Sequence, residues 1–128
     1  MKTPKILVVD DERSVRQAIR FELEEDGYEV HYASNFLEAF ELFHNMGADI
    51  IITDLFLEKG NGVDLIQKIK SENDEQPVIV ITAYPESELG QHAKSIVKDR
   101  FHVKPFFMDQ LKTQVTEILG KQAVSFAS

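Results

Sequence analysis

Residues 49–54 read Asp-Ile-Ile-Ile-Thr-Asp and indicate a short strand buried on both faces, as found in the middle of a parallel sheet. The apolar run stops at Asp54, and residues 55–62, which include Gly60 and Gly62, are predicted to form a loop. An acidic side chain is therefore expected at the carboxyl end of a central strand. In open α/β sheets, ligands bind at this edge.

Strand-like and helix-like segments alternate on both sides of this stretch. Short apolar runs predict further strands at 6–9, 29–32, 78–81 and 101–103. Apolar residues at helical spacing predict helices at about 14–26, 35–47, 65–69, 85–98 and 107–119. Ser34 or Asn35 suits the start of the second helix, and Gly120 is expected to end the last one. This alternation predicts an α/β fold, with a doubly wound parallel sheet covered by helices on both faces.

The composition limits the classes of function. A chain of 128 residues has the size of one domain, and its net charge of −8 argues against binding nucleic acid by itself or docking on an anionic membrane. It contains no cysteine, which excludes disulfides and thiolate metal sites. The apolar run at 6–9 is too short for a signal peptide or a membrane span. We expect a soluble cytoplasmic protein.

Polar side chains follow four of the five predicted strands: Asp10 and Asp11, Asp54, Thr82 and Lys104. Because parallel strands end at one edge of the sheet, these groups are expected to lie together. Three carboxylates repel one another, and one lysine offsets a single negative charge. A divalent cation would offset the other two, and oxygen ligands favour a hard ion such as Mg²⁺.

This set of groups suits phosphoryl transfer. Asp54 can attack phosphorus and become an aspartyl phosphate, while the metal and Lys104 neutralise charge on the transferred group. Thr82 can hydrogen-bond a phosphoryl oxygen. Each residue alone is common in turns and loops, so the prediction depends on their joint occurrence at the strand ends.

The combination resembles the receiver domain of two-component response regulators (the CheY-like superfamily) over about residues 5–119. The matching stretches are Ile-Leu-Val-Val-Asp-Asp-Glu at 6–12, Ile-Ile-Thr-Asp-Leu at 51–55, Val-Ile-Thr-Ala at 80–83 and Val-Lys-Pro-Phe at 103–106. The resemblance implies a flavodoxin-like fold with five parallel strands in the order 2-1-3-4-5 and five helices. Residues 1–120 would form the receiver domain, and residues 121–128 a flexible tail or linker remnant.

The resemblance also implies roles for the residues at the carboxyl edge. Asp54 would be the phosphoacceptor. Asp11 would bind Mg²⁺ directly and Asp10 through water, and Asp54 and the backbone carbonyl of Phe56 would complete the metal site. Two large aromatic side chains, Phe56 and Tyr84, occupy positions that vary in the family. We hypothesise that they shield the phosphoryl group from water and lengthen its lifetime.

Signalling, by the same resemblance, begins at Thr82 and Lys104. The Lys-Pro bond at 104–105 is usually cis in the family. Phosphate would draw Thr82 inward, and Phe101 would turn from an exposed to a buried position. The signalling face would consist of the fourth helix, fifth strand and fifth helix, at about 86–119.

A sensor histidine kinase or a phosphotransfer protein would be the phosphoryl donor. The signalling face would then control an output domain or a partner, and it can also support a homodimer. Such a domain catalyses its own phosphorylation and dephosphorylation but is not an enzyme acting on a diffusible substrate.

Three other functions agree less well with the sequence. A flavodoxin-like electron carrier needs a phosphate-binding loop after the first strand, where the acidic run at 10–12 would repel the flavin phosphate. An aspartyl-phosphate phosphohydrolase usually has a second aspartate two residues after the nucleophile, and that position is Phe56 here. A degenerate receiver that only binds proteins is disfavoured by the complete set of Asp54, Thr82 and Lys104.

Overall fold

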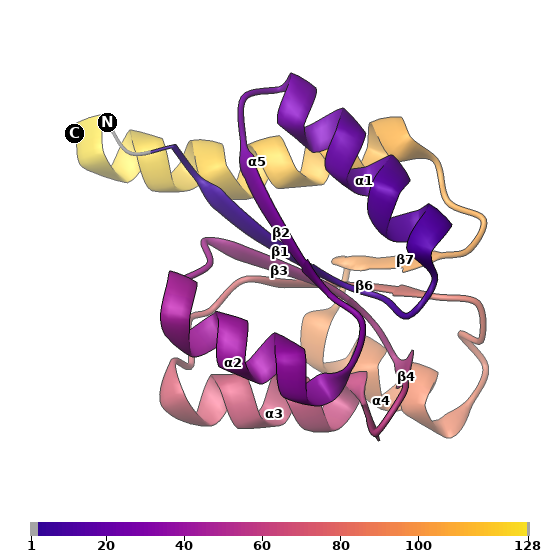
Figure 1. Cartoon of the computed structure of the whole chain (residues 1–128). Coiled ribbons are helices and arrows are strands. Elements are labelled where there is room, and N and C mark those ends of the chain that lie inside the picture. Colours follow the sequence, from indigo (N-terminus) through magenta and orange to yellow (C-terminus); the bar gives the residue numbers. More distant parts are fainter. Residues whose placement is uncertain (1–2, 128) are drawn as a thin grey trace.

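The fold was analysed in a computed structural model that describes residues 3–127, with side chains described for residues 3–120. A parallel sheet of five strands lies at its centre, in the order β2-β1-β3-β6-β7 (Figure 1). These strands are β1 (Lys5–Val9), β2 (Glu29–Ala33), β3 (Ile50–Asp54), β6 (Val78–Thr82) and β7 (Phe101–Val103). Counted along the chain, the sheet has the order 2-1-3-4-5, so the predicted topology is confirmed.

The register explains why the strand ends meet. Ile52 of β3 lies opposite Val8 of β1 on one side and Ile79 of β6 on the other. Every strand pair in this sheet is parallel, so the loops that follow the strands gather at one edge, on the right-hand side of Figure 1. All five residues of β3 are buried, as expected for the central strand.

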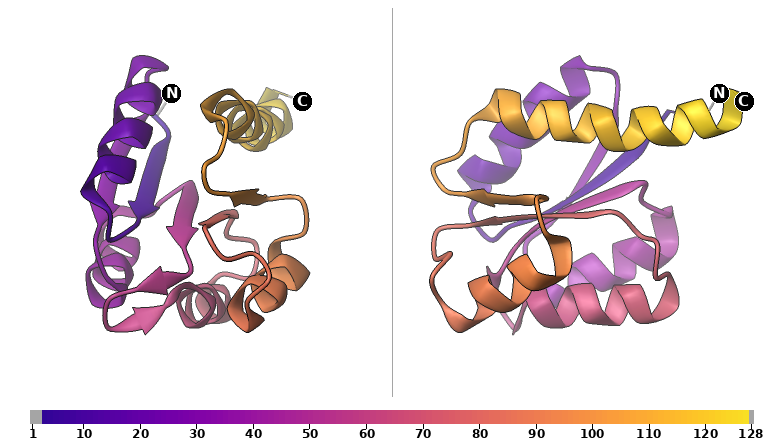
Figure 2. Two further views of the ribbon diagram at one scale, coloured as in Figure 1. Left: turned by 90° about the vertical axis from the view of Figure 1, so that its right-hand side faces the viewer. Right: turned by 180° about the vertical axis from the view of Figure 1, so that it is seen from behind.

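Helices cover both faces of the sheet. They are α1 (Arg13–Glu25), α2 (Phe36–Met46), α3 (Gly62–Glu72), α4 (Glu88–Val97) and α5 (Met108–Ala127). Helices α1 and α5 lie on one face, and α2, α3 and α4 on the other (Figures 1 and 2). Because successive strand side chains point to opposite faces, Ile52 packs in the core under α1 and α5, whereas Ile51 packs in the core under α2 to α4.

Local sequence fixes the ends of α2. The Asn35 side chain accepts a hydrogen bond from the backbone N–H of Glu38 at 3.0 Å, so Asn35 is the cap. The Glu38 carboxylate in turn accepts one from the backbone N–H of Ser34 at 2.8 Å. Gly47 ends the helix with φ +67°, a left-handed conformation that suits glycine.

Two segments differ from the prediction. Residues 55–62 contain a small antiparallel pair, β4 (Phe56–Leu57) and β5 (Gly60–Asn61), where a loop was expected. Strands of two residues are too short to show an alternating pattern. Helix α5 also continues past Gly120, where the sequence predicted its end. Residue 128 and the side chains of 121–127 lie outside the described part, and the division at residue 120 stays a prediction.

Each helix in the described part of the chain is too short or too polar to cross a lipid bilayer.

Candidate functional site

Asp54 is the last residue of the central strand, and it is 6% exposed. One carboxylate oxygen, Oδ1, accepts a hydrogen bond from the backbone N–H of Leu55 at 2.6 Å. The other, Oδ2, lies 3.0 Å from the ammonium nitrogen of Lys104. Gly62, at the start of α3, donates its N–H to the carbonyl of Leu55 at 2.8 Å, and a side chain there would clash with the backbone carbonyl of Asp54. The turn after β3 therefore has a fixed shape that positions the Asp54 carboxylate.

Asp10 follows β1 directly and is fully buried. Its Oδ1 accepts the backbone N–H of Glu12 at 2.8 Å, and Arg16 donates to its backbone carbonyl at 2.7 Å. Burial raises the pKa of the Asp10 carboxyl, partly countered by hydrogen bonds from Lys104 and from the Glu12 backbone. An opposite charge beside Asp10 therefore favours its ionised form.

Lys104 provides that charge. It follows β7, and its Nζ lies 2.8 Å from Asp10 Oδ2, 3.0 Å from Asp54 Oδ2 and 3.0 Å from Glu12 Oε1. Burial alone would lower the pKa of Lys104, but the three carboxylates outweigh burial and raise it. Lys104 is therefore a permanent cation in the physiological range. The Lys104–Pro105 peptide bond is cis, as the resemblance implied.

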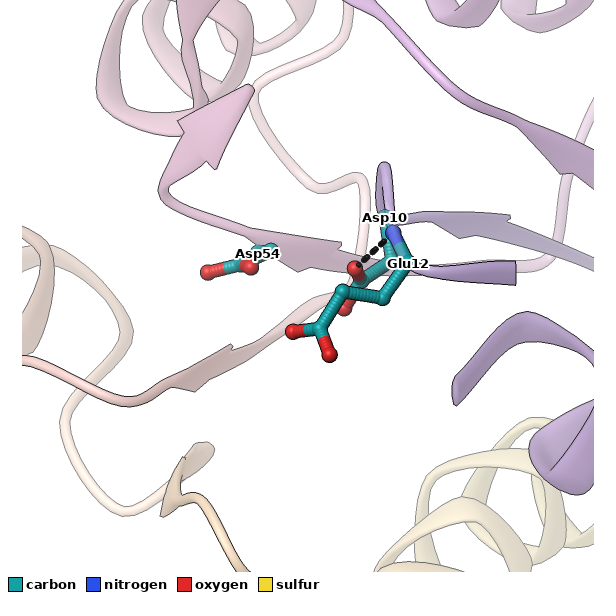
Figure 3. Close-up of side chains that lie close together, drawn as sticks. All are labelled: Asp10, Glu12 and Asp54. Atoms are coloured by element: carbon teal, nitrogen blue, oxygen red, sulfur yellow. Dashed lines mark hydrogen bonds between the residues drawn. The ribbon is translucent and has the colours of Figure 1, made fainter. Parts of the chain in front are cut away.

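Carboxylate oxygens of Asp10, Glu12 and Asp54 lie within 4.8 Å of one another (Figure 3). Together with Lys104 they carry a formal charge of −3 + 1 = −2 when ionised. A hard divalent cation matches both this charge and the all-oxygen donor set. The residues present therefore fit Mg²⁺.

The structure brings only some of the predicted metal ligands together. Asp10 and Asp54 belong to the cluster of three carboxylates. Asp11 is exposed, and the cluster found among the described residues does not include it. Glu12 takes that place, although neither the strand ends nor the family resemblance predicted a role for it. Its backbone N–H donates to the Asp10 side chain, two residues earlier, which is the pattern of an Asx turn and a signal that the Asp-Asp-Glu run contains. The backbone of Phe56 lies in β4, two residues after Asp54.

Thr82 ends β6, the strand beside β3, and is fully buried. Its Oγ1 accepts the backbone N–H of Tyr84 at 3.0 Å, and its backbone carbonyl accepts the N–H of Lys104 at 2.8 Å. In the register of the sheet, Thr82 lies one position beyond the partner of Asp54. The threonine is thus linked through the backbone to the lysine of the site.

Phe56 and Tyr84 contact each other at the carboxyl edge of the sheet. Their ring centroids are 5.3 Å apart at an interplanar angle of 81°, an edge-to-face pair. The two residues are 40% and 62% exposed. Phe56 follows β3 and Tyr84 follows β6, so the pair links the segments that follow these two neighbouring strands.

Phe101, in the edge strand β7, is half-buried. It packs against the core under α2 to α4, and the Lys94 ammonium of α4 lies 5.7 Å from its ring centroid. The Phe101 ring is thus partly exposed and partly packed against this core.

Comparisons with known proteins agree with this geometry. The sequence matches the response regulator receiver domain family over residues 6–116. Regulatory protein AtoC of Escherichia coli (strain K12) is 31% identical over 120 residues, which cover 94% of this chain and 26% of that protein. Sporulation initiation phosphotransferase F of Bacillus subtilis (strain 168) is 27% identical over 119 residues, covering 93% and 96%.

Solved structures agree as well. The receiver domain of Francisella response regulator 1452 superposes with a TM-score of 0.82 at 29% identity, covering 94% of this chain and 99% of that one. A response regulator receiver domain protein from Clostridium thermocellum gives 0.84 at 29% identity, covering 94% and 98%. The chain spans about half of the length, or less, of several curated relatives. It covers 51% of response regulator MprA from Mycobacterium sp. (strain KMS) and 26% of AtoC.

Proposed function

The chain belongs to the response regulator receiver domain family, and from that premise we propose that it accepts a phosphoryl group on Asp54 in the presence of Mg²⁺. The donor is a sensor histidine kinase or a phosphotransfer protein, and transfer switches the surface formed by α4, β7 and α5. The observation that carries this proposal is the position of Lys104, whose ammonium contacts Asp10 at 2.8 Å and Asp54 at 3.0 Å.

The chemistry follows from the two ends of the Asp54 carboxylate. An oxygen of Asp54 forms a bond to phosphorus while the bond from phosphorus to the donor's imidazole nitrogen breaks, and that nitrogen keeps the electron pair. The Leu55 N–H bond holds the carboxylate in orientation during this step. Lys104 stays beside it and offsets negative charge on the phosphoryl oxygens.

Metal binding is assigned to Asp10, Asp11 and Asp54 with the Phe56 backbone carbonyl. When bound, Mg²⁺ supplies charge neutralisation at the transferred group. The buried Asp10 carboxylate and its closeness to the Asp54 carboxylate support this assignment. The proposal includes an inward turn of the Asp11 side chain, which is exposed in the structure, to bind the metal.

The switch is assigned to Thr82 and Phe101. Thr82 gives up its bond with the Tyr84 N–H, donates its hydroxyl to a phosphoryl oxygen and vacates space. Phe101 then completes its burial against the core under α2 to α4. Because β7 lies at the edge of the sheet between α4 and α5, this movement changes the surface that a partner contacts.

That surface is proposed to control an output domain or a partner protein, and to support a homodimer. The domain itself works in the cytoplasm, binds neither nucleic acid nor membrane directly, and catalyses only its own phosphorylation and dephosphorylation. The edge-to-face pair of Phe56 and Tyr84 lengthens the life of the phosphoryl group by limiting access of water.

The test is phosphoryl uptake from a small acyl phosphate, with Mg²⁺ and with a chelator, for the wild type and a Lys104→Met variant. We expect uptake only with Mg²⁺ and a loss of at least about tenfold in Lys104→Met, because a buried charge partner is removed. Lys112→Met is the matched control, since Lys112 pairs with Glu22 and Asp26 away from the site. Uptake that survives both chelation and Lys104→Met would show that these groups do not act as proposed.

A further inference from the structure

Glu12 is the acidic group at the site to which the proposed function gives no task. It lies immediately before α1, and its side chain is 58% exposed. Its Oε1 lies 3.0 Å from Lys104 Nζ, and its backbone N–H donates to Asp10 Oδ1 at 2.8 Å. Glu12 therefore contacts the buried Asp10 carboxylate and also Lys104. Among the described residues, Lys104 is the one cation that contacts all three carboxylates.

The hydrogen bonds of Lys104 are fully used. An ammonium group has three N–H donors, and Lys104 has three carboxylate partners, at 2.8, 3.0 and 3.0 Å. A phosphoryl group on Asp54 adds oxygens that need one of these donors. Asp10 is fully buried, so losing its bond would leave a buried charge unpaired, at high cost. Asp54 is the phosphorylated group itself, so its bond with Lys104 passes to the added oxygens. A second donor for those oxygens must come from the bond to Asp10 or to Glu12. Glu12 is exposed, so water can replace its bond to the lysine, and it is the partner that gives way.

Charge acts in the same direction. The phosphoryl group is an anion, and the Glu12 carboxylate lies beside the ammonium that must neutralise it. Attraction between Glu12 and Lys104 and repulsion between Glu12 and the phosphoryl group therefore both oppose the phosphorylated form.

We propose that Glu12 is a positioning residue that holds Lys104 in the resting state and competes with the phosphoryl group for it. The inference rests on the proposed function, since it assigns a regulator to the same site. Removing the Glu12 charge is expected to tighten the binding of a phosphoryl anion, whereas removing the Lys104 charge would weaken it.

Beryllium fluoride, formed from beryllium chloride and excess fluoride, is the probe, because it occupies the place of a phosphoryl group on a carboxylate without chemical turnover. Its affinity is measured by fluorine NMR at saturating Mg²⁺ for the wild type, Glu12→Gln and Glu58→Gln. Glu58→Gln removes the same charge from an exposed residue in the turn between β4 and β5, at the same edge of the sheet but without contact to Lys104. Thermal melting checks that each variant folds, and Glu12→Ala replaces Glu12→Gln if the latter does not.

We expect Glu12→Gln to bind the probe about three- to fivefold more tightly, the range that a screened ion pair supports, and Glu58→Gln to match the wild type. The gain should shrink at about 1 M salt, where screening acts over about 3 Å. Equal or weaker binding by folded Glu12→Gln, or an equal gain in Glu58→Gln, would overturn the inference alone. A folded wild type that binds no probe would overturn the proposed function, and this inference with it.

Discussion

Replacing Gly62 by alanine should distort the turn that carries Asp54. A side chain at Gly62 would clash with the backbone carbonyl of Asp54 and come within 2.9 Å of Leu55 Cα. Both neighbours are backbone atoms in a buried turn, so they cannot move aside as a flexible side chain would. The added methyl group must therefore displace either the end of β3 or the first turn of α3.

The size of the effect follows from two opposing terms. Forcing an additional methyl group into a packed site costs about 1–3 kcal/mol. Alanine is favoured over glycine in a helix by up to about 1 kcal/mol, but Gly62 is only the first residue of α3, where the gain is smaller. We expect a net loss of about 0.5–2.5 kcal/mol in the free energy of unfolding, or about 4 °C in Tm per kcal/mol for a chain of this size.

Urea unfolding followed by circular dichroism measures this loss. Gly120→Ala is the matched control, because Gly120 lies inside α5 and an added side chain there meets nothing within 4 Å among the residues whose side chains the structure describes. That variant should gain about 0.5–1 kcal/mol. The reasoning about the close approach is refuted if Gly62→Ala is as stable as the wild type while Gly120→Ala behaves as expected.

Three further predictions concern other parts of the chain. Lys98 ends α4 with φ +58° and ψ −116°, a conformation that disfavours side chains, so Lys98→Gly should raise the urea midpoint by an amount equivalent to about 1 kcal/mol; a lower midpoint would contradict this. Phe56→Asn combined with Tyr84→Glu should shorten the half-life of the phosphorylated protein, measured by phosphate release, and an unchanged half-life would show that the aromatic pair does not shield the site. Hydrogen bonds from Ser34 hold the pKa of Glu38 below its ordinary value of 4.5, so their stabilisation is present above that pH and is lost as the pH falls through the lower value in the folded protein. In Glu38→Gln, the free energy of unfolding should therefore fall less than in the wild type as the pH drops from about 6 to about 3. An acid-unfolding curve identical to that of the wild type would be evidence against this.

The sheet was predictable because its central strands are continuous apolar runs. The segments at 50–52 and 78–81 are buried on both faces of the sheet. Every residue in them is therefore apolar, and this pattern is visible in the sequence. The strand ends could be predicted for the same reason, since each run stops at a polar residue. The positions of Asp10, Asp54 and Lys104 relative to one another then follow from parallel topology.

Other features depend on contacts between distant residues. The pairing of β4 with β5 rests on two residues per strand and leaves no periodic signal. The contact of Glu12 with Lys104 joins residues that are 92 positions apart in sequence, so local patterns do not predict it. The half-buried position of Phe101 likewise results from packing of β7 against α4, which the spacing of apolar residues does not specify.

The most direct test of the central claim is the intact mass of the protein after incubation with Mg²⁺ and a small acyl phosphate, beside an Asp54→Asn variant. We predict a gain of one phosphoryl group in the wild type, located by peptide mapping on Asp54, and no gain in the variant or without Mg²⁺. Equal gains in the wild type and Asp54→Asn would place the phosphoryl group elsewhere. A folded wild type that gains nothing from the acyl phosphate or from a histidine kinase would contradict the account.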